Sequence, residues 1–99
     1  MPFEMTVGLN VIDDEKYARY RDEIAPLMQS AGGRFRYDFT IARTLKHEAG
    51  HEINRLFVVH FPDRATKDHF FADPKYVEIR SRLFEKAVKG ATIIAEYTT

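Results

Sequence analysis

The pentapeptide His47 to His51, His-Glu-Ala-Gly-His, matches the H-E-x-x-H pattern of zinc peptidases. That pattern makes a metal site on a helix, which turns both imidazoles to one face and holds the glutamate over the metal-bound water. Here the segment contains Gly50 and lacks the apolar periodicity of a buried helix. We therefore expect a loop between two strands, with no catalytic metal and no cofactor. Adventitious binding of a transition metal by the two histidines stays open.

A second group of polar residues has the chemistry needed for acid–base catalysis. Strand alternation predicts that His60, Asp38 and Arg36 share one sheet face, away from the helices, with Asn10 and Glu96. A histidine beside a carboxylate can act as a general acid or base near pH 7, and an arginine can hold an anionic substrate. His60, Asp38 and Arg36 are therefore candidate catalytic residues. The alternative, which we favour, is a polar seam in a dimer interface.

Aromatic residues are candidates for a pocket that takes a flat ligand between helices and sheet. The residues expected to line it are Tyr37, Phe57, Phe70 and Tyr76. Such a set more often forms the core of a small domain, because aromatic side chains bury large areas. Both interpretations are kept.

Four segments have the pattern of strands that could position these residues. Residues 4–11 alternate apolar and polar side chains, as in a strand with one buried face. Residues 34–45 alternate in the same way, whereas residues 53–61 are more continuously apolar, as in a central strand. The fourth predicted strand covers residues 91–97.

Helices are predicted after the first and third strands. Asp13 offers an N-cap for the first helix, in which Pro26 is expected to cause a kink or a break near residues 23–25. Asp63 caps the second helix, which is predicted to be broken and to restart at Asp73-Pro74, because proline suits the first helical position.

The resulting order, β-α-β-β-α-β, predicts one α+β domain over residues 1–99 with a ferredoxin-like fold. In this fold two helices cover one face of a four-stranded antiparallel sheet. The strands carry too many apolar groups for the other face to remain in water, so we expect a second copy to cover it. The predicted contact residues of this homodimer are Leu56, Val58 and Ile94.

Composition excludes several classes of partner. Lys plus Arg and Asp plus Glu each number 15, so the formal net charge is zero and no basic stripe suits a nucleic acid. The absence of cysteine excludes disulfides, thiolate metal sites and thiol nucleophiles. No run approaches the ~20 apolar residues needed to span a bilayer. We expect a cytoplasmic protein without nucleic-acid or membrane partners.

Four sequence motifs are informative at the level of family. They are Tyr20-Arg21 to Pro26 leading to Gly32-Gly33-Arg34-Phe35, then Phe61-Pro62-Asp63-Arg64-Ala65, then Phe70-Phe71-Ala72-Asp73-Pro74-Lys75-Tyr76, and Ala95-Glu96-Tyr97. With them the chain resembles the dimeric α/β-barrel proteins known as domain of unknown function 1330. The resemblance implies a ferredoxin-like protomer whose sheet packs on a partner's sheet, and an uncharacterised function. Looser relatives of this superfold include cofactor-free monooxygenases, haem-degrading enzymes and small decarboxylases or isomerases.

Three hypotheses follow. The first is a small homodimer that binds a small organic molecule. The second is a cofactor-independent enzyme of the monooxygenase or isomerase type, acting on a small aromatic or acidic substrate, with His60 and Asp38 in acid–base roles and Arg36 as anchor. The third is a non-enzymatic interaction module. A ligand-sized cavity containing His60 or Tyr76 would favour the second hypothesis over the first, and a solid core would favour the third.

Overall fold

Four strands form one antiparallel sheet in the order β2-β3-β1-β4 in the computed structural model, which describes residues 1–99. The strands are β1 (Phe3–Val11), β2 (Arg34–Thr40), β3 (Arg55–Phe61) and β4 (Val88–Thr98). The helical elements are α1 (Asp14–Ser30), α2 (Arg64–Ala72), α3 (Pro74–Ile79), the wide turn η1 (Arg80–Phe84) and α4 (Glu85–Ala87). The predicted β-α-β-β-α-β order is confirmed. No helix is long and apolar enough to cross a membrane.

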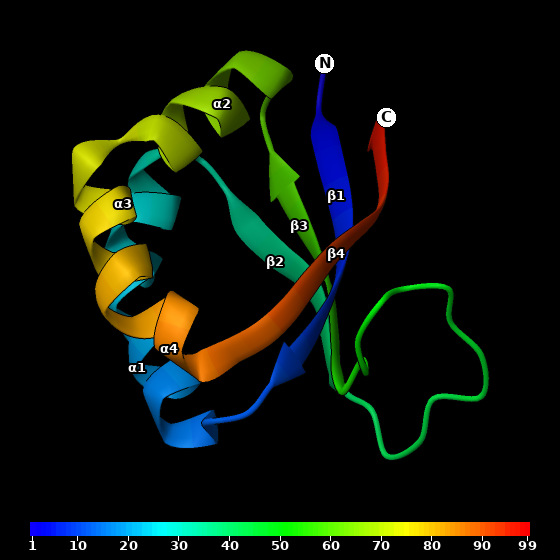
Figure 1. The fold of residues 1–99 in the computed structure, drawn as a ribbon. Helices are drawn as coiled ribbons and strands as arrows, with labels where there is room; N and C mark the ends of the chain where they lie inside the picture. Colours follow the sequence, from blue (N-terminus) through cyan, green and yellow to red (C-terminus); the bar gives the residue numbers. More distant parts are fainter.

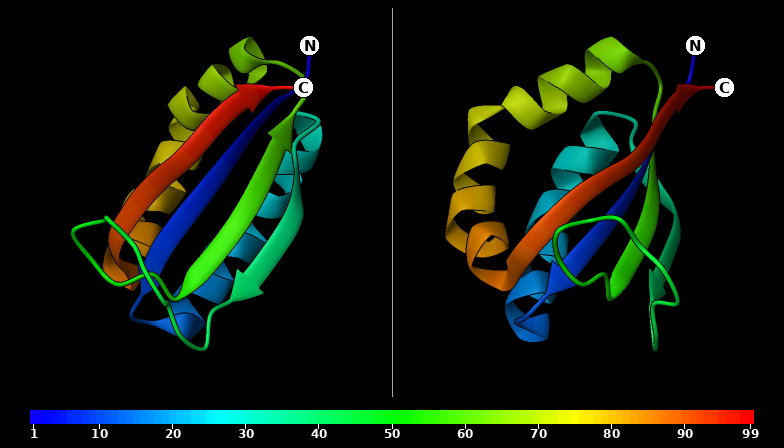
Figure 2. Two further views of the ribbon diagram at one scale, coloured as in Figure 1. Left: turned by 90° about the vertical axis from the view of Figure 1, so that its right-hand side faces the viewer. Right: turned by 45° about the vertical axis from the view of Figure 1, so that its right-hand side comes forward.

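All helices lie on one side of the sheet, and the other side is free of helices (Figure 1). The left view of Figure 2 looks onto this helix-free face, with α1 and the second helical segment behind the strands. The odd-numbered residues of β1 point to the helices and are buried, among them Phe3, Leu9 and Val11. In β3 the odd-numbered Phe57, Val59 and Phe61 complete this side of the core.

Helix α1 begins and ends where the sequence indicates. The Asp13 side chain accepts a hydrogen bond from the backbone N–H of Lys16, at 2.9 Å. At the other end Gly32 has a φ of 72°, a left-handed conformation that favours glycine, and the N–H of Gly33 reaches the carbonyl of Met28 at 2.9 Å. The predicted break near residues 23–25 is wrong, because α1 runs uninterrupted through Pro26, whose side chain lies on the exposed face.

The second helical segment is broken, as predicted. Asp73 ends α2, and its carboxylate accepts the N–H of Lys75 at 2.8 Å, so that Pro74 can begin α3. In η1 the carbonyl of Arg80 accepts the N–H of Glu85, five residues on, which is the spacing of a π turn.

The connection between β2 and β3 is longer than the sequence indicates. Strand β2 ends at Thr40 and β3 begins at Arg55, so residues 41–54 form a loop without helix or regular strand. Several hydrogen bonds hold the loop, among them that of Thr44 Oγ1, which donates to the carbonyl of Ile53 at 2.7 Å, and that between His51 Nε2 and Oγ1 of Thr92 in β4, also 2.7 Å long. The pentapeptide of the zinc-peptidase pattern lies within this loop, as predicted.

Candidate functional site

A bulge in β2 decides which face its side chains occupy. Phe35 pairs with Val59, and Tyr37 pairs with Val58, so Arg36 is an extra residue without its own partner. The alternation therefore reverses after the bulge, and Tyr37 faces the helix-free side. The prediction that Tyr37 lines a pocket between helices and sheet is wrong for this reason.

The same bulge turns Asp38 to the helix side, so the prediction that Asp38 lies beside His60 and Arg36 is also wrong. Its carboxylate accepts two hydrogen bonds from Arg55, both 2.9 Å long. Nη2 of Arg21, from α1, lies 3.1 Å away, although its alignment is not that of a hydrogen bond. Burial raises the pKa of Asp38, but the Arg55 hydrogen bonds and the Arg21 charge outweigh it and leave the pKa below its ordinary value.

His60 and Arg36 both contact the carboxylate of Glu4, a residue that the sequence pattern did not single out. One carboxylate oxygen of Glu4 lies 2.9 Å from His60 Nδ1 and accepts a 2.8 Å hydrogen bond from Arg36 Nη1. The other accepts the hydroxyl of Tyr97 at 3.0 Å. Each of these four residues comes from a different strand of the sheet. We call them the Glu4 cluster, and they lie on the helix-free face.

Glu4 is the single charged residue in the buried set, with 2% of its surface exposed. The hydrogen bond with His60 is the largest influence on its carboxyl group, and those from Arg36 and Tyr97 act in the same direction. Together they outweigh burial and lower the pKa of Glu4 from 4.5 to about 2. The carboxylate therefore stays ionised in spite of its burial.

The two remaining members of the predicted polar set do not join this cluster. In β4 an extra residue at Ile94 shifts the register, so that Val7 pairs with Ile93 and Thr6 with Ala95. As a result Glu96 faces the helices, which corrects the predicted placement. Asn10 lies near the opposite end of β1, where its Oδ1 accepts a 3.3 Å hydrogen bond from Asn54.

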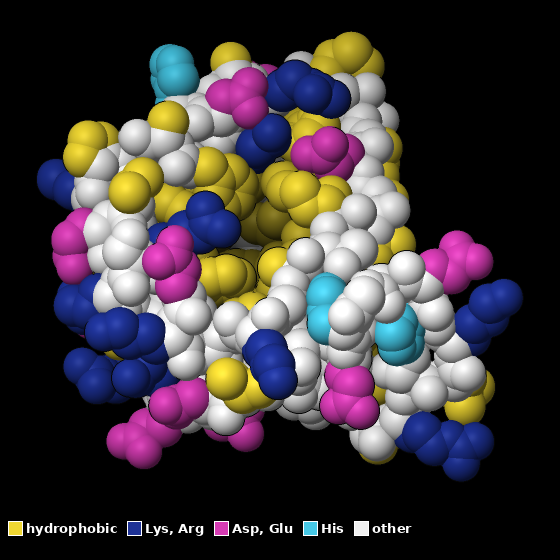
Figure 3. Space-filling view, in the orientation of Figure 1, with side chains coloured by type: hydrophobic (Ala, Val, Ile, Leu, Met, Phe, Trp, Pro, Cys, Tyr) yellow, Lys and Arg dark blue, Asp and Glu magenta, His cyan; other side chains and the backbone are white.

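A partly enclosed cleft of about 300 Å³ lies between the helices and the sheet. Figure 3 shows its opening between the helical layer and β4, with a hydrophobic interior and charged side chains at its rim. Three of the four residues predicted to line a pocket do line it: Phe57, Phe70 and Tyr76. The rest of the lining is mostly aliphatic and aromatic, and Lys67, Arg80 and Glu96 are its charged members.

The most buried polar groups of the cleft are phenols. The hydroxyls of Tyr20 and Tyr76 are 2.9 Å apart, and either can donate to the other. Burial raises the pKa of both, so both are neutral at physiological pH. Two hydroxyls carry two protons, and their mutual hydrogen bond uses only one. One O–H donor thus remains for an acceptor inside the cleft.

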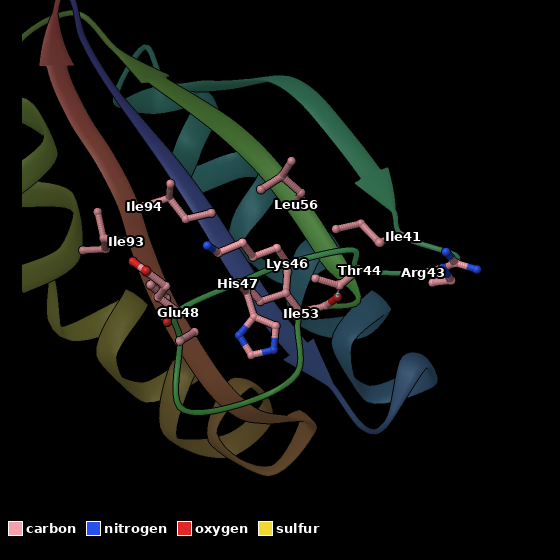
Figure 4. Close-up of a pocket in the computed structure, with 12 residues that line it drawn as sticks. Ile41, Arg43, Thr44, Lys46, His47, Glu48, Ile53, Leu56, Ile93 and Ile94 are labelled. Carbon is pink, nitrogen blue, oxygen red and sulfur yellow. Dashed lines mark hydrogen bonds between the residues drawn. The ribbon is translucent and has the colours of Figure 1, made fainter.

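A second, wider groove of about 840 Å³ lies on the helix-free face, beneath the loop of residues 41–54. Figure 4 shows Lys46, His47 and Glu48 from the loop above Leu56 and Ile94 from the sheet. His51, the other histidine of the pentapeptide, has both ring nitrogens in hydrogen bonds, to Thr92 and to the carbonyl of Glu52. No group of three or more His, Cys, Asp or Glu side chains is arranged to hold a metal ion.

A model of the family described as domain of unknown function (DUF1330) matches residues 5–97. The chain belongs to this family. No curated protein matches it in sequence. The resemblance expected from the four motifs is thereby confirmed, and the DUF1330 assignment leaves the molecular function open.

Solved structures share the fold of this DUF1330 protein. One is a protein of unknown function from Rhodopseudomonas palustris, with a TM-score of 0.82 and 18% identity over 99% of this chain and 82% of that one. Another is a dimeric ferredoxin-like protein of unknown function from Jannaschia, with a TM-score of 0.60 and 15% identity over 100% of both chains. A third is a hydroxynitrile lyase from Passiflora edulis, with a TM-score of 0.68 and 13% identity over 97% of this chain and 91% of that one. The predicted ferredoxin-like fold is confirmed.

Proposed function

We propose that the protein binds a small, flat, largely apolar organic molecule in the cleft between its helices and its sheet. The observation that carries this proposal is a partly enclosed cleft of about 300 Å³, lined by aromatic rings, in which the Tyr20–Tyr76 pair leaves one O–H donor unused. Pockets for small ligands typically begin near this volume and combine an apolar lining with a few fixed polar groups. The cleft is also more enclosed than the wider groove beneath the loop.

The proposal includes a homodimer formed through the helix-free faces. Tyr37 and Phe39 stack on this face with 52% of each exposed, and Ile94 is exposed to the same extent. Leu56 and Val58 of β3 lie between β1 and the aromatic pair of β2, and Leu56 and Ile94 line the same groove, so apolar side chains from three strands lie on this face. A neighbour of this fold described as dimeric supports the assembly. Such a dimer would cover the open groove beneath the loop, whereas the helix–sheet cleft would stay accessible.

Calorimetric titration with 2-naphthamide, a neutral flat probe, tests ligand binding. For a molecule of this size we expect a Kd of about 1 mM or tighter. The variant Ala91→Trp should abolish binding, because Ala91 lines the cleft and a large ring there fills it. The variant Ala72→Trp, with the same change at an exposed position outside the cleft, is the control and should bind as the wild type does. Equal binding by Ala91→Trp would contradict the proposal.

A second candidate is a cofactor-independent enzyme of the monooxygenase or isomerase type. Tyr76 lies in the cleft, which is one of the features expected for it, and a hydroxynitrile lyase exists on this fold. The candidate catalytic residues argue for the first proposal instead, because His60 and Arg36 belong to the Glu4 cluster on the other face. Asp38 would act as an ion-pair partner of Arg55 rather than as a base.

Oxygen uptake with a naphthohydroquinone tests the monooxygenase form. Uptake above the spontaneous rate that is lost in His60→Gln and retained in His69→Gln would support it. His69 is an exposed residue of α2 and serves as the matched control. Uptake at the spontaneous rate alone would rule this form out for that substrate class.

A further inference from the structure

The rim of the cleft carries a positive charge that the chain itself does not neutralise. Nζ of Lys67 lies 2.8 Å from a carboxylate oxygen of Asp68 and 3.9 Å from one of Glu96, so this ammonium group is paired. Arg80 forms no ion pair with any carboxylate of the chain. It is exposed, lines the cleft, and its guanidinium lies 5.6 Å from the centre of the Phe84 ring. A free cation therefore stands at the entrance of an aromatic cavity.

The backbone around Arg80 supports a role in binding. Arg80 opens the π turn η1, and turns of this kind are rare within helices and occur frequently at functional sites. Tyr76, four residues before Arg80, and Phe84, four residues after it, also line the cleft. One side of this helical segment thus presents a phenol, a guanidinium and a phenyl ring to the same space.

We infer that the molecule bound in the cleft is a small aromatic carboxylate, an inference that rests on the proposed function. Its ring lies among the aromatic side chains of the interior, and its carboxylate binds the guanidinium of Arg80 at the rim. The planar fork of an arginine matches a carboxylate with two parallel N–H···O bonds. The unused phenol proton of the Tyr20–Tyr76 pair then selects ligands with an oxygen substituent on the ring.

Two probes of the same shape separate this inference from the proposed function. 2-Naphthoate and 2-naphthamide differ in charge and have nearly the same size, so their ratio of Kd values reports the contribution of the carboxylate. We expect 2-naphthoate to bind about tenfold more tightly to the wild type at low salt. Raising the salt concentration should weaken the binding of 2-naphthoate and leave the affinity for 2-naphthamide nearly unchanged.

Variants of Arg80 and Arg82 test which arginine causes the preference for 2-naphthoate. Arg80→Gln should reduce the ratio to about one, and Arg80→Lys should restore part of it, because lysine keeps the charge without the fork. Arg82→Gln is the matched control and should keep the wild-type ratio. Arg82 belongs to the same turn but pairs with Glu23 and Glu78 and does not line the cleft.

Each outcome has one meaning. A wild-type ratio that collapses in Arg80→Gln alone supports the inference. Equal binding of the two probes by the wild type, or an unchanged ratio in Arg80→Gln, overturns it and leaves the proposed function standing. Binding of neither probe to the wild type overturns both.

Discussion

The helix–sheet cleft and the helix-free face differ in the polar groups that they bury. Within the cleft the most buried polar groups are phenols, among them those of Tyr20 and Tyr76, which burial keeps neutral, and the charged groups of the cleft lie at its rim. On the helix-free face the carboxylate of Glu4 is buried and stays ionised, and aromatic side chains such as Tyr37 are exposed. A buried charge is tolerated where each neighbouring strand supplies a hydrogen bond to it. In a cavity whose lining is largely apolar, a neutral group is favoured because a buried charge would lack such partners.

The largest effect is expected on the helix-free face. Val58→Asp should place an unpaired carboxylate in the dimer contact, at a cost of about 3–5 kcal/mol to the dimer. Sedimentation velocity should then detect monomer or unfolded protein at concentrations where the wild type is a dimer. Val77→Asp, on α3 with 46% of the native side chain exposed, is the control and should remain dimeric. A wild type that sediments as a monomer at micromolar concentration would show that this face is not an interface.

The next effect concerns the Glu4 cluster itself. Glu4→Gln leaves His60, Arg36 and Tyr97 facing an amide that has one acceptor oxygen in place of two, so partly buried donors lose a partner. We expect a loss of about 1–3 kcal/mol in the free energy of unfolding, measured in urea at neutral pH. Glu85→Gln, at an exposed helix position, should change it by less than about 0.5 kcal/mol. Equal stability of the two variants would mean that the cluster contributes nothing.

The difference in stability between the wild type and Glu4→Gln should also depend on pH. The pKa of Glu4 is lowered from 4.5 to about 2, so above pH 4.5 the carboxylate is ionised in both states and its stabilisation is complete. As the pH falls from about 4.5 to about 2, the unfolded chain binds a proton before the native one does, and that stabilisation is lost. The stability difference between wild type and Glu4→Gln should therefore shrink over this range. Titrations of Asp38 and the other carboxylates occur in both proteins and cancel in the difference.

The smallest effect is expected in the cleft. Tyr76→Phe removes the hydroxyl pair but keeps the ring, so the free energy of unfolding should change by no more than about 1 kcal/mol. The affinity for 2-naphthamide should change by no more than about threefold, because the hydroxyl of Tyr20 still offers one O–H donor to the cleft. Tyr97→Phe, on the other face, should leave this affinity unchanged. A larger loss of binding in Tyr97→Phe than in Tyr76→Phe would place the ligand on the wrong face for our proposal.

The order of elements and the faces of two strands could be predicted, since their alternation is strict. In β1 and β3 every odd residue from Phe3 to Val11 and from Phe57 to Phe61 faces the helices, as a period of two requires. Caps such as Asp13 and Asp73 were recognisable because their chemistry is local. Pro26 was misjudged because its effect depends on exposure, which a local pattern does not specify.

The faces of the other two strands could not be predicted. Strand β2 contains an extra residue at Arg36, and β4 contains extra residues at Lys89 and Ile94; the alternation reverses at each of them. A bulge has no reliable local signature, so Asp38 and Glu96 were assigned to the wrong side. Glu4 was missed because an alternating carboxylate looks solvent-exposed until its cross-strand partners are known. The one available signal was the pairing of the first and third strands, which sets Glu4 opposite His60.

The Glu4 cluster also has a consequence for the order in which the chain can fold as it is made. Glu4 leaves the ribosome before its three partners, the last of which, Tyr97, follows 93 residues later. Strand β1 lies in the middle of the sheet, so one of its edges stays open until β4 has emerged. Until then one carboxylate oxygen of Glu4 lacks its partner from β4, beside an unpaired strand edge that is prone to association. We therefore expect ribosome-bound chains that stop before β4 to lack stable structure and to depend on chaperones for solubility.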